Sequence, residues 1–327
     1  MSEITNLERR KLLQSLAVTS LLPAAGLTRA QTGYPERPIR IIVPYTAGGH
    51  SDMIAREVAQ GLSKRLGQTV FVENKPGANS IIGTEVVAKS PPDGYTFLVV
   101  VAAYSINPSM YTNLPYSPRD LAPVTQLTQN SLIGVTGLPG ISNIADFVRH
   151  GHANGITFAS SGTGSAVHLL GERFARAAKI ENAVHVAYKS AAEPLRDLMA
   201  GLVSIEFDGI AVLGPHIKSG KLVPLVVTGE TRDPLLPNTP TLKESGYDIV
   251  ANSWAALLAP AQTPQAIIDR VAAETDKVLR DKELQEKFAK LGIEPVGGTP
   301  AQLNTMISRE MKIYGDLVKQ LGIAMAL

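Results

Sequence analysis

The first part of the chain alternates short apolar runs with a stretch in which apolar residues recur every four positions. Short runs rich in Ile and Val predict buried strands, and the four-residue spacing predicts a helix with one apolar face. The expected elements are strands at residues 39–43, 70–72 and 95–101, a helix from about residue 51 to 66, and a shorter helix capped by Ser80 that ends at Ala88. This β-α-β-α-β order favours a mostly parallel sheet with helices on both faces.

A second set of alternating elements begins near residue 130. The apolar run at 97–103 is interpreted as a buried strand that stops before Asn107 and Pro108, and not as a membrane span. Further strands are expected at 132–135, 157–159, 184–187, 203–207 and 222–227, and helices at 144–149, 166–178, 193–200, 264–279 and 300–318. Both halves of the chain therefore use the same device, which is a strand, a glycine-rich turn and a helix.

Two of these turns carry residues suited to binding an anion. The first glycine loop is Tyr45, Thr46, Ala47, Gly48, Gly49, His50, Ser51 and Asp52, and the second glycine loop is Ser160, Ser161, Gly162, Thr163, Gly164 and Ser165. In open α/β sheets ligands bind where strands end and helices begin. A helix N-terminus offers free N–H groups and about half a positive charge, so it can hold an anion without Lys or Arg. The alternative is that both loops are ordinary helix starts with serine caps.

Four other side chains are candidates for the same site. Asp208 follows a strand and either accepts a hydrogen bond from a ligand N–H or O–H group or forms a turn with Gly209. His168 either bonds to the ligand or orders the second glycine loop. Tyr104 and Ser105 follow an apolar strand and should lie at the same sheet edge, where Tyr104 packs either on a ligand ring or in the core.

Two segments resemble enzyme motifs, but each lacks a residue that the motif requires. Residues 49–53 resemble the G-x-S-x-G nucleophile elbow, but Met53 replaces the last glycine. Residues 162–167 fail the dinucleotide fingerprint because Val167 replaces its third small residue. The six histidines form no H-E-x-x-H pattern, and no Walker A sequence is present. We expect no catalytic residue, no cofactor and no metal.

Composition narrows the class further. Hydrophobic residues make up 44% of the 327 residues, enough for a substantial core, whereas the net charge of +2 is too weak a basic excess to indicate a nucleic-acid partner. The absence of cysteine excludes disulfides, thiolate metal sites, a Cys nucleophile and a lipoprotein-type anchor.

Residues 1–30 have the features of an export signal. Arg9, Arg10 and Lys11 precede an uncharged, apolar-biased run, and residues 28–30 provide a small–x–small cleavage site. The run is short for a membrane span, so a cleavable signal peptide and a periplasmic protein are expected. Residues 8–13 also resemble a twin-arginine leader, and the choice between the two export routes stays open.

Ordered landmarks along the chain resemble the Bug family, the substrate-binding receptors of tripartite tricarboxylate transporters. The resemblance covers residues 34–322. The landmarks are Pro38 to Pro44, Ala47-Gly48-Gly49, Glu73 to Gly77, Pro92 to Thr96, Ile106-Asn107-Pro108, Ala159 to Gly162, His168-Leu169, Tyr188-Lys189, Pro215 to Leu222 and Leu257 to Pro260.

The resemblance implies a type II periplasmic-binding-protein fold, with two doubly wound α/β domains and a ligand cleft at the hinge. Residues 31–128 plus 255–327 would form one domain and residues 129–254 the other, with crossings near 125–130 and 250–256. In this family the two glycine-bearing loops hold carboxylates mainly through main-chain amides and water. The implied site is Thr46 to Asp52, Ser160 to Ser165, His168 and Asp208.

The function implied is a monomeric receptor that closes on a di-, tri- or aromatic carboxylate and delivers it to membrane subunits of a secondary transporter. His50 and Tyr104 depart from the residues usual in the family, which suggests the hypothesis that they stack on an aromatic carboxylate. Unchanged affinity in His50→Ala and Tyr104→Ala would contradict it. Two alternatives stay open, namely a serine hydrolase using Ser51 with His50 or His168, and an accessory protein that reports a carboxylate to a membrane kinase.

Overall fold

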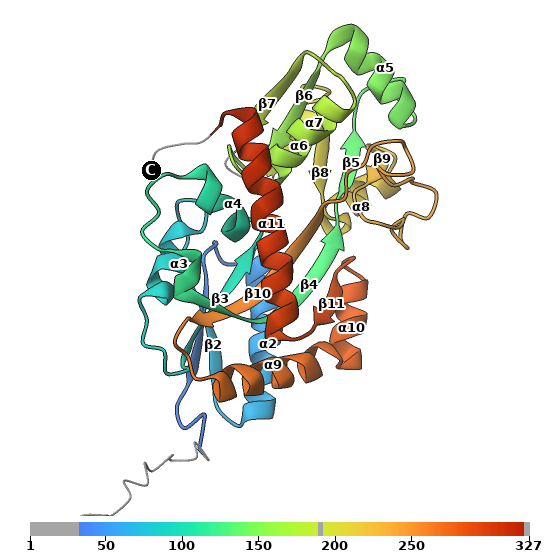
Figure 1. The fold of residues 1–327 in the computed structure, drawn as a ribbon. Helices are drawn as coiled ribbons and strands as arrows, with labels where there is room; N and C mark the ends of the chain where they lie inside the picture. Colours follow the sequence, from blue (N-terminus) through green and yellow to red (C-terminus); the bar gives the residue numbers. More distant parts are fainter. Residues whose placement is uncertain (1–32, 189–191, 324–327) are drawn as a thin grey trace, which may run out of the picture. The chain divides into compact units, whose positions relative to one another are not determined.

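The computed structural model describes residues 33–188 and 192–323, and the leader expected over residues 1–30 lies outside them. From Pro35 onward the chain forms one compact unit. Strands and helices alternate along most of it, as the apolar pattern predicts (Figure 1). In this described part of the chain no helix has both the length and the apolar character needed to cross a bilayer.

A six-stranded sheet in the order β11-β4-β10-β3-β1-β2 is the larger of the sheets. β1 pairs in parallel with β2 and β3, whereas β10 is antiparallel to β3 and β4. The strands are β1 (Ile39–Val43), β2 (Val70–Asn74), β3 (Thr96–Val101), β4 (Leu121–Ser131), β10 (Asn252–Pro260) and β11 (Glu294–Gly297).

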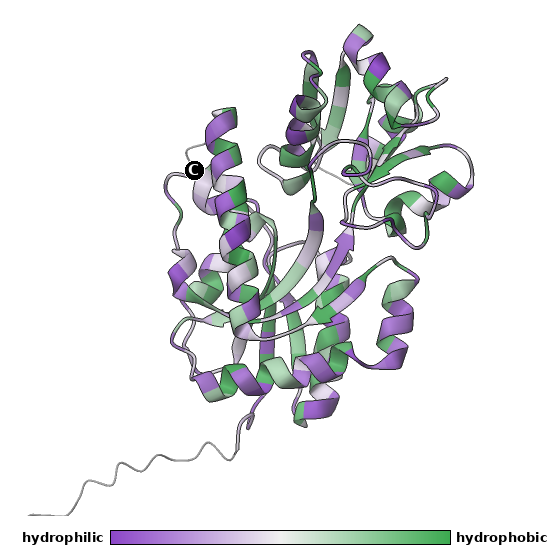
Figure 2. Cartoon of the chain, turned by 45° about the vertical axis from the view of Figure 1, so that its right-hand side comes forward, coloured by the Kyte–Doolittle hydropathy of each residue, from purple (hydrophilic) through white to green (hydrophobic). Residues whose placement is uncertain are grey.

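Helices cover both faces of this sheet because its central strands are apolar on both sides. Ile42 and Leu98 share one core cluster with three helices, while their neighbours Ile41 and Val99 are buried on the opposite face. The first face carries α3 (Ile81–Ala88), α4 (Ala103–Met110) and α11 (Pro300–Leu321), and the second carries α2 (His50–Leu66) and α9 (Gln265–Leu279). In Figure 2 the helices carry alternating hydrophobic and hydrophilic stretches, consistent with one side packed on the sheet and the other facing solvent.

The second set of strands is arranged as β8-β5-β9 and β6-β7, joined by a bridge between Phe158 and Ile205. Phe147 and Phe174 pack on one face, and Leu198 and Leu213 on the other. The strands are β5 (Ile133–Thr136), β6 (Ile156–Ser160), β7 (Ala183–Ala187), β8 (Glu206–Asp208) and β9 (Val223–Val227), and the helices are α5 (Ile144–Asn154), α6 (Ala166–Ala177), α7 (Ala192–Met199) and α8 (Ile210–Lys218).

The chain passes between the two sets of strands along two neighbouring strands. β4 continues into β5 with only Leu132 between them, and β10 brings the chain back after β9. β4 and β10 are paired over their full length, from Ser131 opposite Asn252 to Leu121 opposite Pro260. The domain boundaries at residues 128/129 and 254/255 fall on this pair of strands and stay a prediction.

Several elements differ from the sequence expectation. Residues 103–110 form α4, with Pro108 inside it, where the sequence suggested the end of a strand. Ser80 precedes α3 but its side chain makes no cap hydrogen bond, and its φ of 73° is left-handed. The strand expected at 203–207 is shorter and later, as β8. The short helix η1 (Pro118–Asp120), α8 and α10 (Lys282–Ala289), and the strand β11, were not expected.

Candidate functional site

The first glycine loop leaves the carboxyl end of β1, between the ends of β2 and β3. Gly48 has a left-handed φ of 82°, which glycine adopts without strain. Gly49 is the N-cap of α2, and no side chain caps this helix. The helix therefore begins at His50, and the alternative of a serine-capped helix start does not hold here. The amides of Gly49, His50 and Ser51 have no hydrogen-bond partner among the described residues.

The carboxylate of Asp52 holds the first glycine loop in shape. Its Oδ2 accepts hydrogen bonds from the Gly48 amide and from Arg56, both at 2.9 Å, and its Oδ1 accepts from Asn74 at 2.8 Å. Asn74 also donates to the carbonyl of Tyr45 at 3.0 Å. The hydrogen bonds from Arg56, Gly48 and Asn74 lower the pKa of Asp52 to about 2. Asp52 is buried and its hydrogen bonds shape the loop, and a contact between Asp52 and a ligand stays a prediction.

The rest of the first glycine loop is open to solvent. Thr46, Ala47, Gly48, Gly49 and His50 are exposed. Surrounding protein atoms nevertheless lower the pKa of His50 below its ordinary value. The main chain of these exposed residues is accessible to a ligand.

Tyr45 and Ser51 are less exposed than residues 46–50 of the first glycine loop. Tyr45 is half-buried, and desolvation raises the pKa of its hydroxyl above the ordinary value. Ser51 is buried and makes no side-chain hydrogen bond to a described residue. Neither side chain presents a charge, so the main-chain amides remain the principal donors of the loop.

The second glycine loop follows β6 and opens α6. Gly162 and Gly164 have φ values of 130° and 79°, which side chains rarely adopt. Ser165 is the N-cap of α6, and its hydroxyl accepts a hydrogen bond from the His168 amide at 3.2 Å. The serine cap expected from sequence is therefore confirmed for this helix alone. The amides of Ser161 and Thr163 have no partner among the described residues.

Two stacked histidines contact residues of the second glycine loop. The Nδ1 of His168 accepts a hydrogen bond from the Gly164 amide at 3.0 Å, so the neutral ring carries its proton on Nε2. The ring centroid of His168 lies 3.8 Å from that of His185, whose Nε2 lies 2.6 Å from the Ser160 hydroxyl. Burial and the neighbouring His185 lower the pKa of His168 to about 4. His168 thus orders the second glycine loop, and a hydrogen bond from its Nε2–H to a ligand stays a prediction.

His185 was not among the candidates, although the structure makes it part of this support. Its strand β7 pairs in parallel with β6, which sets His185 beside Phe158 and close to Ser160. The sequence offered no signal for this contact beyond a histidine within the expected strand at 184–187.

The second glycine loop packs against the helix that follows β3. A Cβ on Gly164 would lie 2.9 Å from the Cε of Met110, so glycine permits this close approach. Leu169 of α6 belongs to the core cluster of the six-stranded sheet. Because β3 and β1 are parallel neighbours, α4 and the first glycine loop leave the same edge of that sheet.

Tyr104 lies in the core, and this corrects its place among the ligand contacts. Only 3% of its surface is exposed, and its hydroxyl donates to the Pro118 carbonyl at 3.1 Å. Ser105 is fully buried as well, and its hydroxyl has no partner among the described residues. Both belong to α4, which turns them into the apolar cluster. Stacking of Tyr104 on an aromatic ligand is therefore not supported.

Asp208 stands at the end of β8, half-buried, beside the start of α8. Its Oδ1 accepts a hydrogen bond from the Gly209 amide at 2.7 Å. Burial raises the pKa of Asp208. This bond joins Asp208 to the N-cap residue of α8, and no turn is formed at these two residues. A role of Asp208 as ligand acceptor stays a prediction.

No catalytic constellation forms around Ser51. Its hydroxyl has no hydrogen bond to a described histidine, and the Nδ1 of His168 is already used by Gly164. Within residues 33–188 and 192–323, no three His, Asp or Glu side chains gather in a way that could hold a metal ion. The described residues thus provide binding groups for an anion and no assembled nucleophile.

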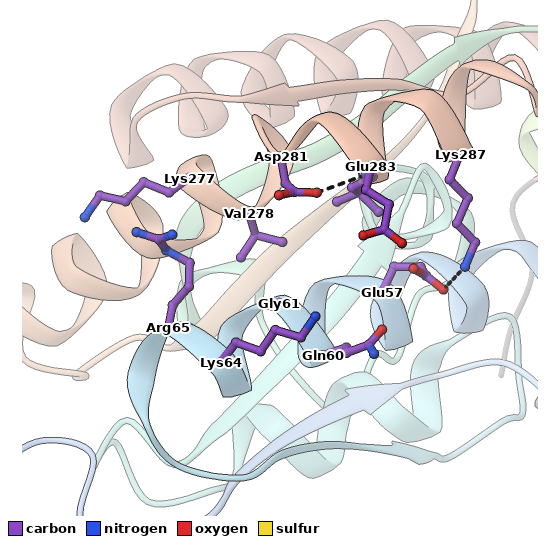
Figure 3. A pocket seen from close by; sticks show the side chains of 11 residues that line it. Glu57, Gln60, Gly61, Lys64, Arg65, Lys277, Val278, Asp281, Glu283 and Lys287 are labelled. Carbon is purple, nitrogen blue, oxygen red and sulfur yellow. Dashed lines mark hydrogen bonds and ion pairs between the residues drawn. The ribbon is translucent and has the colours of Figure 1, made fainter.

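A surface pocket of about 300 Å³ lies elsewhere, between α2, α9 and α10 (Figure 3). It includes no residue of either glycine loop. Three of its cations are engaged in ion pairs, because Lys287 pairs with Glu57, and Arg65 and Lys277 both pair with Glu274.

Comparison with known proteins identifies the family. Residues 54–323 match the family described as tripartite tricarboxylate transporter family receptor. The chain belongs to this family. It is 33% identical to the protein BugT of Bordetella pertussis over 322 residues, and this alignment covers 93% of the chain and 98% of BugT.

Solved structures of the same kind confirm the α/β periplasmic-binding-protein fold. The periplasmic binding protein BugD is 32% identical, with a TM-score of 0.77 over 90% of this chain and 100% of BugD. The R. palustris protein Rpa4515, solved with adipate, is 31% identical, with a TM-score of 0.80 over 90% of this chain and 100% of Rpa4515. The chain is thus a solute-binding protein of a receptor family.

Proposed function

We propose that this protein is an extracytoplasmic receptor that holds a small carboxylate between its two glycine loops and delivers it to a membrane-embedded secondary transporter. One observation carries the proposal. α2 and α6 both begin at the carboxyl end of a strand, and each presents amides that no described residue accepts from. Such amides, at the positive end of a helix, match a carboxylate group.

Three further observations support this function. Rpa4515 is a relative solved with adipate. The family is one of transporter receptors. The expected leader over residues 1–30 agrees with export to the periplasm, where such receptors meet their ligands.

Substitutions at Gly49 test the role of the amides. Gly49 has a φ of −78°, which proline also adopts, and Pro264 already occupies the matching N-cap of α9. Gly49→Pro removes one N–H, whereas Gly49→Ala keeps it and places a Cβ no closer than 3.5 Å to the Thr46 carbonyl. Calorimetry with adipate and malate should show an affinity loss of about tenfold or more for the proline variant, since a hydrogen bond to a charged group contributes about 1.5–3 kcal/mol.

The alanine variant is the control, and its affinity should stay within about threefold of wild type. Far-UV circular dichroism and thermal unfolding verify that both variants fold. Equal affinities for Gly49→Pro and wild type would contradict binding through this loop. Conversion of the acid during the incubation, followed by chromatography, would contradict the receptor function itself.

A further inference from the structure

One oxygen of a buried carboxyl group near the candidate site, that of Glu206, has no hydrogen-bond partner among the described residues. Glu206 of β8 is 6% exposed, and its Oε2 makes no hydrogen bond to any of the described residues. Burial, and to a lesser degree Asp208, raise the pKa of Glu206 to about 7. Burying such a group without a partner costs several kcal/mol by the usual order of magnitude, so its presence calls for a compensating interaction.

Strand pairing places Glu206 and Asp208 on the same face of β8. Glu206 lies opposite Val135 and Asp208 opposite Ile133, and directly paired residues of antiparallel strands point to the same side of a sheet. Val135 and Ile133 are both in the core cluster that contains Leu198 of α7 and Leu213 of α8. The two carboxyl groups therefore follow one another toward the end of β8, where the chain reaches the candidate site.

Among the described residues near these two carboxyls, Tyr188 and Arg196 interact with Asp197. Tyr188 is half-buried near Glu206, but its hydroxyl donates to Asp197 at 3.0 Å. Arg196 pairs with the same Asp197. Asp208 receives one hydrogen bond, from the Gly209 amide. Among the ion pairs of the described residues, none includes Glu206 or Asp208.

We propose that Glu206 and Asp208 form a subsite for a positively charged amine, so that the ligand is an amino-carboxylate and not a plain dicarboxylate. The inference rests on the proposed function, in which the glycine loops hold the carboxylate group. A protonated amine brings three N–H donors and a positive charge, which satisfy two carboxyls at once. A second carboxylate at this place would be repelled by them.

Ligand series of equal length test the subsite. Calorimetry is done at about pH 8, where a Glu with a raised pKa is ionised. The first series compares succinate, malate, aspartate and 4-aminobutyrate. Two longer series compare glutarate, glutamate and 5-aminopentanoate, and adipate, 2-aminoadipate and 6-aminohexanoate. In the series that fits, an amine-bearing acid should bind about tenfold or more tightly than the plain dicarboxylate.

Glu206→Gln keeps the shape of the side chain and removes its charge. It should weaken binding of the amine-bearing acid by about tenfold, and leave the plain dicarboxylate unchanged or bound more tightly. Glu283→Gln, at an exposed position of α10, is the matched control and should change neither affinity. If Glu206→Gln does not fold, Asp208→Asn decides, with the same expected loss.

The outcomes separate this inference from the function on which it rests. If a dicarboxylate binds as tightly as every amine-bearing acid, and the variants preserve that order, the amine subsite is wrong while the carboxylate receptor stands. If no member of any series binds, both are wrong. A selective loss of amine affinity in both variants establishes the subsite.

Discussion

The two glycine loops reach a similar backbone arrangement by different chemistry. In the first, an ionised carboxylate, Asp52, collects donors from Gly48, Arg56 and Asn74, and the helix that follows has no side-chain cap. In the second, neutral groups do this work, since Ser165 caps α6 and His168 accepts from Gly164. The first loop therefore depends on a charge that persists to low pH, and the second on an imidazole that must stay uncharged.

Acid should separate the two loops most clearly. The pKa of His168 is about 4 in the folded protein against 6.5 ordinarily, so between these values the unfolded chain takes up a proton that the folded chain does not. The free energy of unfolding should fall as the pH drops from about 6.5 to about 4, by up to roughly 3 kcal/mol from this residue. Urea unfolding at about pH 7 and about pH 4.5 measures the loss.

The variant His168→Asn should reduce that acid-induced loss, because an amide oxygen can replace Nδ1 as the acceptor and does not titrate. His150→Asn, on α5 and away from both loops, is the control. An equal loss in wild type and His168→Asn would show that His168 is not the acid-sensitive group.

Removing the charge from the first loop should have the next largest effect. Asp52→Asn replaces the acceptor of three hydrogen bonds, and we expect a loss of about 2 kcal/mol in the free energy of unfolding near neutral pH. Arg56→Gln should cost less than about 1 kcal/mol, because the Arg56 side chain is 52% exposed. Chemical denaturation of both variants makes the comparison, and equal costs would argue against Asp52 as the centre of the network.

The two left-handed glycines offer a matched pair of smaller changes. Gly48 and Gly164 have φ values of 82° and 79°, so alanine brings similar backbone strain of about 1 kcal/mol to each. Only Gly164 faces a neighbour, Met110. Gly164→Ala should therefore be destabilising by about 1 kcal/mol more than Gly48→Ala in thermal unfolding. Equal effects would mean that α4 yields freely to the loop.

The serines at the two helix starts should give the smallest effects. Ser165→Ala removes a cap and should cost about 1 kcal/mol, whereas Ser51→Ala removes none and should stay within about 0.5 kcal/mol. Calorimetric melting measures both. An ester-hydrolysis assay on Ser51→Ala adds a separate check, since loss of a measurable wild-type turnover would favour the hydrolase alternative.

The alternation of strands and helices was predictable because it depends on local periodicity. Residues 39–101 follow the expected order closely. α4 was missed because the apolar run of β3 continues into it and Pro108 suggests a stop. β4 and β10 show little alternation, and Pro123 interrupts the first of them. Their pairing joins residues more than a hundred positions apart, which no local pattern encodes.

The two glycine loops were recognisable in the sequence, but their supporting contacts were not, and the binding site itself stays a prediction. Gly49 and Ser165 are both N-caps, yet the sequence equally allowed Ser51 to cap α2. The contact of His185 with Ser160 depends on the register of β6 with β7. Glu206 was visible only as one charged residue in an apolar run. Such contacts follow from tertiary pairing, and sequence periodicity carries no information about them.

The uncapped start of α2 bears on how binding preference can diverge among relatives. Main-chain N–H groups can bind an anion whatever side chains the loop carries, provided that the backbone conformation is unchanged. Exchanging residues 46–49 between two such receptors should therefore preserve carboxylate binding without transferring the preference for a particular acid. On this proposal, ligand selectivity changes through the side chains around the bound carboxylate group, while the loop itself stays the same.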